Sequence, residues 1–170
     1  GTTGDPKGVM LTHGNVRFGG LTSATLRDMT HADVVYGVLP TTHVFGLCSV
    51  VVAAVYAGAP VLLAPRFEVA KVYAALRAGV TLFSGVPQMH ALLMQYTKEQ
   101  GLKVLGSKTL RYVSSGAAPL DPTWKREAEA FYGVALQNGY GMTETTAGVS
   151  ATRNDIGVVD TSVGPALPGV

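Results

Sequence analysis

The sequence contains a single cysteine, Cys48, which cannot form a disulfide within the chain or provide a cysteine-based metal site. This scarcity indicates a reducing compartment, and we expect a cytoplasmic protein. Charge is also sparse, because only 14% of the residues are charged, and 13 lysines and arginines oppose 11 aspartates and glutamates without a basic block. A net charge of +2 spread along the chain excludes the usual electrostatic mode of nucleic-acid binding, and we expect no nucleic-acid partner.

Long uninterrupted hydrophobic runs are missing as well. No permanent charge lies between Asp33 and Arg66, but Pro40 and then residues 58–60 interrupt this stretch. The longest helical run that remains, residues 45–57, is shorter than the roughly 20 residues that a bilayer requires. We therefore expect a buried helix here and no integral membrane segment.

The sequence is rich in apolar residues, and these fall into segments that alternate between strand and helix patterns. Hydrophobic residues make up 47% of the 170 positions, enough for the core of one domain and too many for intrinsic disorder. We expect strands at residues 9–11, 34–39, 61–63 (buried), 80–84, 110–114 and 134–137, and helices at residues 15–28, 46–57, 69–78, 89–96 and 122–131. This succession predicts an α/β fold with a mostly parallel sheet and helices on both faces. The loops at the carboxyl ends of the strands then meet at one edge, where ligands bind.

The first chemically distinctive loop spans residues 1–8, Gly-Thr-Thr-Gly-Asp-Pro-Lys-Gly. Its glycines free backbone N–H groups to face an anion, Thr2 and Thr3 add hydroxyl donors, and Lys7 supplies a mobile positive charge suited to phosphate oxygens. It is not a Walker loop, because Gly8 follows the lysine. The alternative interpretation is a Gly-Asp-Pro surface turn.

The second distinctive loop spans residues 138–146. Tyr140 lies between two glycines and offers a flat face for stacking a purine. Thr143 offers a hydroxyl donor, and Glu144 is a hard oxygen ligand of the kind that holds magnesium beside phosphates. Taken singly, each residue also has a purely structural interpretation as a loop anchor, a cap or a solvated carboxylate.

Five motifs in order resemble the adenylate-forming superfamily, which includes acyl-CoA synthetases, luciferases and the adenylation domains of peptide synthetases. Residues 1–8 are similar to its phosphate loop and residues 39–46, Leu-Pro-Thr-Thr-His-Val-Phe-Gly, to its acyl-pocket motif. Residues 115–120 are similar to its adenine-side loop, residues 139–145 to its nucleotide signature, and residues 162–165 with 168–169 to the stretch that follows. The resemblance covers the whole chain, which we expect to be an α/β part of the large N-terminal domain.

The resemblance implies a two-step ligase that uses ATP, Mg²⁺ and coenzyme A. A carboxylic acid is first activated as an acyl-adenylate and is then transferred to the thiol of coenzyme A. By the family pattern, the β- and γ-phosphates would be held by Thr2, Thr3, Gly4 and Lys7, the α-phosphate by Thr143, and magnesium by Glu144. Adenine would be enclosed by Gly116, Ala117, Ala118 and Tyr140. The other residues expected to bind the nucleotide are Asn138, Gly139, Gly141 and Met142. The residues expected to be catalytic are Lys7, His43, Thr143 and Glu144.

The acyl pocket is expected to be lined by His43, Val44, Phe45, Val86 and Gly116. Amino-acid-activating relatives carry an aspartate in the segment that corresponds to residues 44–49, whereas this segment is uncharged here. A buried ammonium group without a partner would be unfavourable, so a fatty or aryl acid fits better than an amino acid.

Several other interpretations stay open. His43 has an alternative role as a packing residue, while His13, His31 and His90 are expected at the surface or at caps, and Cys48 is expected to be a buried structural thiol. The family's ribose-binding aspartate, hinge and C-terminal domain would lie beyond residue 170, so we expect the rest of the chain to be a partner and the isolated piece to be inactive. A noncatalytic nucleotide- or acyl-binding module and a luciferase-like oxygenase are the alternatives to the ligase.

Overall fold

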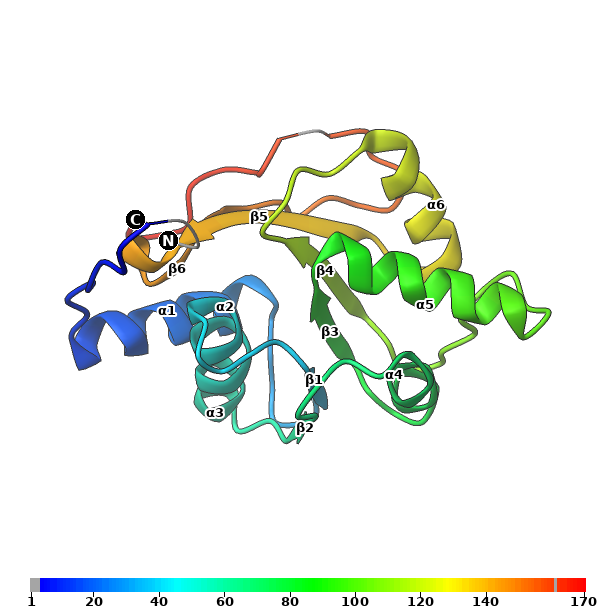
Figure 1. The fold of residues 1–170 in the computed structure, drawn as a ribbon, viewed down its shortest axis with the longest axis horizontal. Coiled ribbons are helices and arrows are strands. Elements are labelled where there is room, and N and C mark those ends of the chain that lie inside the picture. The colour runs from blue at the N-terminus through cyan, green and yellow to red at the C-terminus, as the bar shows by residue number, and fades with distance from the viewer. Residues whose placement is uncertain (1–3, 161) are drawn as a thin grey trace.

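Six strands form one sheet in the order β2-β1-β3-β4-β5-β6 (Figure 1). The computed structural model describes residues 4–160 and 162–170. The strands are β1 Val35–Gly37, β2 Val61–Leu63, β3 Leu82–Gly85, β4 Tyr112–Gly116, β5 Leu136–Met142 and β6 Ala147–Ala151. Strands β1 to β5 pair in parallel and β6 is antiparallel to β5, which confirms the predicted mostly parallel sheet.

Helices cover both faces of the sheet (Figure 1). One face carries α1 His13–Leu26, α2 Val44–Gly46, the π-helical segment η1 Leu47–Val52 and α3 Ala53–Ala57. The opposite face carries α4 Val69–Arg77, α5 Pro87–Glu99 and α6 Pro122–Tyr132. A short 3₁₀ turn, η2 Thr143–Thr145, joins β5 to β6.

The core follows the alternation of side chains along the strands. Tyr36 and Phe83 belong to the larger apolar cluster, which they share with buried residues of α4, α5 and α6. Their neighbours Val35 and Leu82 belong to a second cluster with residues of η1 and α3. Because successive side chains of a strand point to opposite faces, the central strands are buried on both sides.

Local signals in the sequence set several helix ends as predicted. Thr12 caps α1, where its hydroxyl accepts a hydrogen bond from the Asn15 N–H at 3.1 Å and its own N–H donates to the Asn15 side chain at 2.9 Å. Asp121 caps α6 by accepting from the Trp124 N–H at 2.8 Å, with Pro122 in the first turn. Gly58 ends α3 at φ +70°, the left-handed conformation that glycine adopts without strain.

Two predicted elements were wrong, and a third was correct in its bounds but not in its burial. Residues 9–11 are not a strand but an irregular segment before α1. Strand β2 exists but is not buried: Leu62 and Leu63 are 47% and 65% exposed because β2 is the edge strand of the sheet. The predicted loop 138–146 is strand as far as Met142, since pairing with β6 satisfies its backbone groups despite its glycines.

The apolar helix predicted at residues 46–57 is present, but its pitch changes along its length. It starts at Val44 and widens into the π-helix η1 before returning to α geometry in α3. It is also less buried than predicted, because Val55 and Tyr56 are 73% and 59% exposed. Among the described residues, no helix has both the length and the apolar character needed to cross a membrane.

Candidate nucleotide and acyl site

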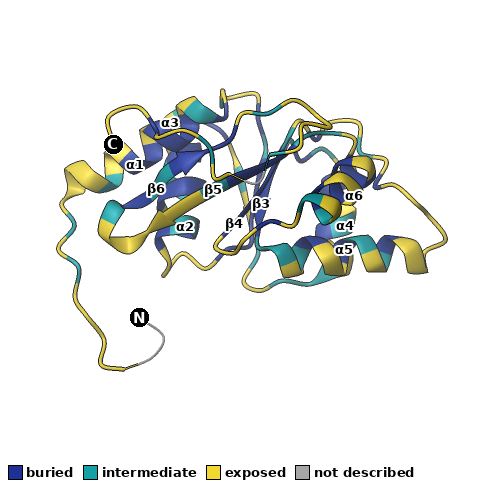
Figure 2. Cartoon of the chain, turned by 90° about the horizontal axis from the view of Figure 1, so that it is seen from above, coloured by how far each residue is buried: buried dark blue, intermediate teal, exposed yellow. Residues whose placement is uncertain are grey.

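A pocket opens beside the carboxyl ends of β4 and β5, between the end of α1, the start of the α2–η1 helix and β6. Its cavity volume is about 90 Å³. Figure 2 shows that β4 is mostly buried, whereas the segment before α1, the end of β5 and the turn between β5 and β6 are exposed. The pocket therefore lies at the sheet edge where parallel α/β folds bind ligands.

Three motifs that are far apart in the sequence converge on this pocket. The lining residues that were expected from the sequence are His43, Val44, Phe45, Gly116, Ala117, Asn138, Gly139, Tyr140 and Gly141. They come from the acyl-pocket, adenine-side and nucleotide motifs. The register of β4 and β5 places Gly116 directly beside Gly139, so two of these motifs meet through strand pairing.

Glycines keep the pocket walls close. A Cβ atom at Gly116 would lie 3.2 Å from a ring carbon of Phe45, which is tighter than ordinary contact. A Cβ atom at Gly141 would lie 1.8 Å from the Ala147 carbonyl oxygen, a clash with backbone that no rotamer could relieve. Tyr140, between Gly139 and Gly141 in the sequence, lines the same pocket and is 48% exposed.

His43 has a defined structural role and also lines the pocket. It precedes α2, and its Nδ1 accepts a hydrogen bond from the Phe45 N–H at 3.1 Å. In the neutral ring the proton is therefore on Nε2. His43 is exposed, so it is not packed in the core, and its structural role is that of a cap for α2.

The other predicted residues lie outside the pocket lining. These are Gly4, Lys7, Val86, Ala118, Met142, Thr143 and Glu144, while Thr2 and Thr3 fall outside the described residues. Lys7 and Glu144 are exposed, and Glu144 lies in η2. Val86 is half-buried and packs against the same core cluster as Phe45, outside the pocket lining. The phosphate and magnesium roles of these residues stay predictions.

The pocket has unmet hydrogen-bonding capacity. Among the described residues, the Ser115 hydroxyl and the Nε of Arg27 are buried and have no hydrogen-bond partner, and both residues line the pocket. Buried polar atoms are nearly always paired, so these two atoms provide hydrogen-bonding capacity for a water or another molecule in the pocket.

Glu144 could hold a magnesium ion only together with substrate phosphates and waters. Across residues 4–160 and 162–170, no three His, Cys, Asp or Glu side chains are grouped closely enough to hold a metal. Mg²⁺ is usually held by one or two carboxylates, several waters and substrate phosphates. A single exposed carboxylate in the β5–β6 turn is compatible with that arrangement.

Arg27 in the pocket wall and His90 in the core were not predicted correctly from the sequence. Arg27 was not singled out, yet its side chain is buried in the pocket wall. His90 was expected at the surface or at a cap and is instead fully buried, which corrects that prediction. The spacing of His90, Leu93 and Thr97, all buried on one face of α5, is the helical signal that could have identified it.

Comparisons with known proteins agree with the motifs. The chain matches the family described as AMP-binding enzyme over residues 1–170. The 4-coumarate–CoA ligase 2 of Oryza sativa subsp. japonica is 40% identical over 154 residues, which cover 85% of this chain and 26% of that protein. The o-succinylbenzoate–CoA synthetase (MenE) of Bacillus subtilis, in complex with ATP and magnesium, has a TM-score of 0.85 at 30% identity over 99% of this chain and 34% of that one.

The chain corresponds to part of a larger N-terminal domain. The N-terminal domain of FACL13 from Mycobacterium tuberculosis has a TM-score of 0.83 at 25% identity, covering 99% of this chain and 42% of that structure. The chain thus spans less than half of each relative described. Because the family match runs along the whole chain, this chain belongs to the AMP-binding enzyme family and is similar to part of the N-terminal domain of its acid–CoA ligases.

Proposed function

We propose that this chain forms the nucleotide- and acyl-binding part of an ATP-dependent acid–CoA ligase. The observation that carries the proposal is the convergence of the acyl-pocket, adenine-side and nucleotide motifs on one pocket. The family membership and the similarity to a 4-coumarate–CoA ligase support it. The full-length protein would convert a carboxylic acid, ATP and coenzyme A into an acyl-CoA, AMP and pyrophosphate.

The first step brings two anions together. A carboxylate oxygen of the acid attacks the α-phosphorus of ATP, and the bond to the β-phosphate oxygen breaks as pyrophosphate leaves. Alignment and charge stabilisation are the main tasks of the protein in such a step. We assign the β- and γ-phosphates to Thr2, Thr3 and Lys7, and the α-phosphate to Thr143. Magnesium, when bound at Glu144, would neutralise phosphate charge.

The second step forms the thioester. The sulfur of coenzyme A attacks the acyl carbonyl carbon, the bond to the phosphate oxygen breaks, and AMP leaves. His43 lines the pocket next to Phe45, so its imidazole would lie where the acyl and adenylate portions meet.

The body of the acid would pack against the apolar part of the pocket. Val44 and Phe45 line it, and the close approach of Gly116 to the Phe45 ring limits its width. Fatty and aryl acids are the expected classes.

Acid-dependent exchange of pyrophosphate into ATP, measured on the full-length protein with a panel of carboxylic acids, tests this function. We expect exchange with at least one acid, and a fall of about 10²- to 10³-fold for Lys7→Ala and Glu144→Ala because each removes an electrostatic stabiliser. Lys103→Ala and Glu127→Ala, which change exposed residues far along the chain from both motifs, are the matched controls. Absence of exchange with every acid would overturn the ligase assignment, and unchanged rates in both site variants would overturn the two residue assignments.

A further inference from the structure

Arg27 places a buried positive charge in the pocket wall. It is the residue directly after α1, only 6% exposed, and it lines the pocket together with Phe45 and Tyr112. An arginine stays protonated at any physiological pH. The pocket therefore contains a permanent cation that the sequence-based description of an uncharged acyl site did not include.

The described partners of this cation are neutral. Its Nη1 donates a hydrogen bond to the Ser49 carbonyl oxygen, and its guanidinium carbon lies 5.5 Å from the centre of the Tyr112 ring. Its Nε is buried and has no hydrogen-bond partner among the residues that the structure describes. Within residues 4–160 and 162–170, no carboxylate forms an ion pair with Arg27.

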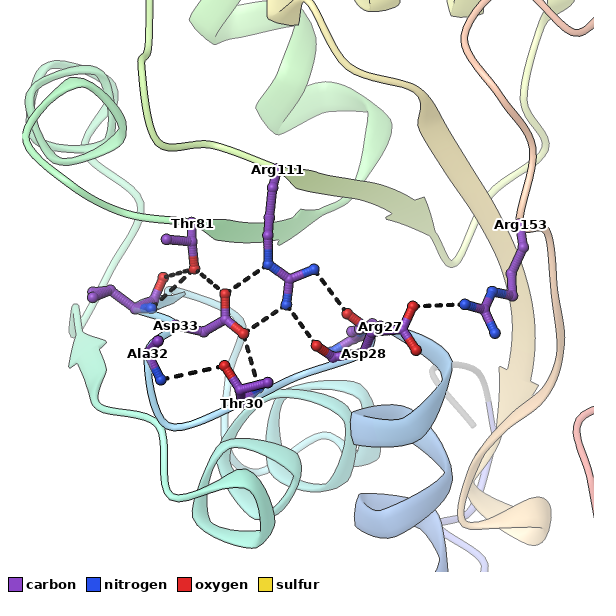
Figure 3. A network of polar contacts seen from close by, with 9 residues as sticks. Arg27, Asp28, Thr30, Ala32, Asp33, Thr81, Arg111 and Arg153 are labelled. Carbon is purple, nitrogen blue, oxygen red and sulfur yellow. Dashed lines mark hydrogen bonds and ion pairs between the residues drawn. The ribbon is translucent and has the colours of Figure 1, made fainter.

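The acidic residues nearest in sequence are committed to other arginines (Figure 3). Asp28 pairs with Arg153 at 2.6 Å, and Asp33 pairs with Arg111 at 2.6 Å. Neither carboxylate is available to neutralise Arg27. A buried charge without an opposite charge is strongly unfavourable, so the arrangement indicates an anion that is supplied from outside the described chain.

The backbone of Arg27 is fixed from the sheet side. Arg111, just before β4, donates from Nη1 to the Arg27 carbonyl oxygen at 3.0 Å and from Nη2 to the Asp28 carbonyl oxygen at 2.9 Å (Figure 3). These bonds hold the end of α1 against the start of β4. The backbone position from which the Arg27 side chain extends is thereby fixed.

We infer that Arg27 binds a second anionic group on the acid substrate, so that the preferred acids combine an apolar body with a distal carboxylate. The neighbouring hydroxyls of Ser23 and Ser49, 3.3 Å apart and both lining the pocket, add hydrogen-bonding capacity at the same wall. This inference rests on the proposed function and narrows its substrate class. The apolar body of the acid would still pack against Phe45, so the proposed site has an apolar part as well as a charged end.

A phosphate of the nucleotide is the other anion to consider. Lys7 and Thr143, which are assigned to phosphates, and Glu144, which is assigned to magnesium, lie outside the lining that contains Arg27. Arg27 instead shares its wall with Phe45 and Tyr112. The geometry therefore favours the acid over the nucleotide as the source of the anion.

Pyrophosphate exchange on the full-length protein tests the inference with α,ω-dicarboxylic acids of increasing length, each paired with its own monomethyl ester. The ester keeps the reacting carboxylate and the body but lacks the second charge. At the best length we expect the diacid to exceed its ester by about 10-fold or more in kcat/KM, as one charge-assisted hydrogen bond would give. In Arg27→Met the diacid should lose this advantage, while the ester stays within about threefold of wild type and Arg27→Lys retains part of the preference.

Arg17→Met, which removes an exposed arginine from the same helix, is the matched control and should keep the wild-type preference. The wild-type comparison needs no variant, so it tests the inference even if Arg27→Met does not fold. Monoesters that react as well as or better than every diacid would overturn the inference while leaving the ligase function intact. An Arg27→Met variant that raises the KM for ATP equally with both acids of a pair would make Arg27 a nucleotide contact and would also overturn it. No exchange with any acid would instead overturn the proposed function itself.

Discussion

The imidazole of His90 and the phenol of Tyr132 lie 2.7 Å apart in the core between α5 and α6. The other ring nitrogen, Nε2, lies 3.2 Å from the Ser114 carbonyl oxygen, which can only accept. His90 therefore donates from Nε2 to β4 and accepts from Tyr132 at Nδ1. A neutral imidazole thus ties two helices to the strand that leads into the pocket.

The buried His90 should make stability depend on pH. Burial lowers the pKa of His90 from 6.5 to about 4, so the unfolded chain binds the proton more tightly than the folded chain does. The contribution is fully present above pH 6.5 and is lost as the pH falls toward 4, by up to about 3 kcal/mol. Urea unfolding of the 170-residue chain at pH 7 and pH 5, followed by the fluorescence of its single tryptophan, measures this difference.

His90→Gln should flatten this pH dependence and lower stability at pH 7, because it removes the aromatic packing and disturbs both hydrogen bonds. His31→Gln, a change of an exposed histidine, should leave the slope intact. A wild-type chain that is equally stable at both pH values would show that His90 does not bind its proton differently in the two states.

Arg111 should be needed for the stability of the α1–β4 junction. Burial alone would raise the pKa of Asp33, but hydrogen bonds from Arg111, the Thr30 N–H and Thr81 outweigh it and hold the pKa at about 2. The Asp33 side chain is only 5% exposed, so Arg111→Met would leave a buried carboxylate without its partner and should destabilise the fold by about 3 kcal/mol. Chemical denaturation at pH 7 measures the loss.

Arg66→Met is the comparison for that change, since Arg66 forms an ion pair with Glu68 while its side chain is 78% exposed. Its effect should stay below about 1 kcal/mol. Equal losses in the two variants would contradict a special role for the Arg111–Asp33 pair. Adding Asp33→Asn to Arg111→Met should recover part of the stability, because the buried charge is then removed.

The ion pair between Lys125 and Glu129 should be the second strong electrostatic contribution. Both side chains are 2% exposed, and the Glu129 carboxylate also accepts from the N–H groups of Leu136 and Gly157, each at 3.0 Å. Lys125→Met should therefore cost about 3 to 5 kcal/mol in the free energy of unfolding, because it leaves a buried carboxylate without a cation.

The matched variant is Lys71→Met, which breaks an exposed pair with Glu68 on α4. Its loss should be below about 1 kcal/mol by the same denaturation measurement. If Lys125→Met proves as mild as Lys71→Met, the buried pair is not stabilising in the way described here.

The sequence predicted those features that depend on short-range chemistry. Thr12, Asp121 and Gly58 mark helix ends through bonds and backbone angles that involve residues no more than four positions away. The motif loops were likewise recognisable as strings of residues. The strand-helix alternation gave the parallel sheet, because each segment shows its own period of apolar residues.

Features set by distant neighbours were not predicted. The exposure of β2 depends on its place at the sheet edge, and the extension of β5 to Met142 depends on a partner that follows it in the chain. Arg27 resembles an ordinary polar residue at a helix end until Ser49 and Tyr112 are seen beside it. No local pattern reveals the surroundings of Arg27, because its contacts with Ser49 and Tyr112 join residues 22 or more positions apart.

The helix that follows His43 carries a pocket residue and a core residue on either side of η1. Phe45, at its beginning, lies close to Gly116 at the pocket, while Ala54, near its end, is packed in the core. The π-helical turn of η1 already holds more residues per turn than an α-helix, which turns by about 100° for each residue. Inserting one further residue between Phe45 and Ala54 would rotate one end relative to the other by about that angle, and either the pocket wall or the core contact would be lost. Substitutions at outward positions such as Val55 should be tolerated, whereas a single-residue insertion should not.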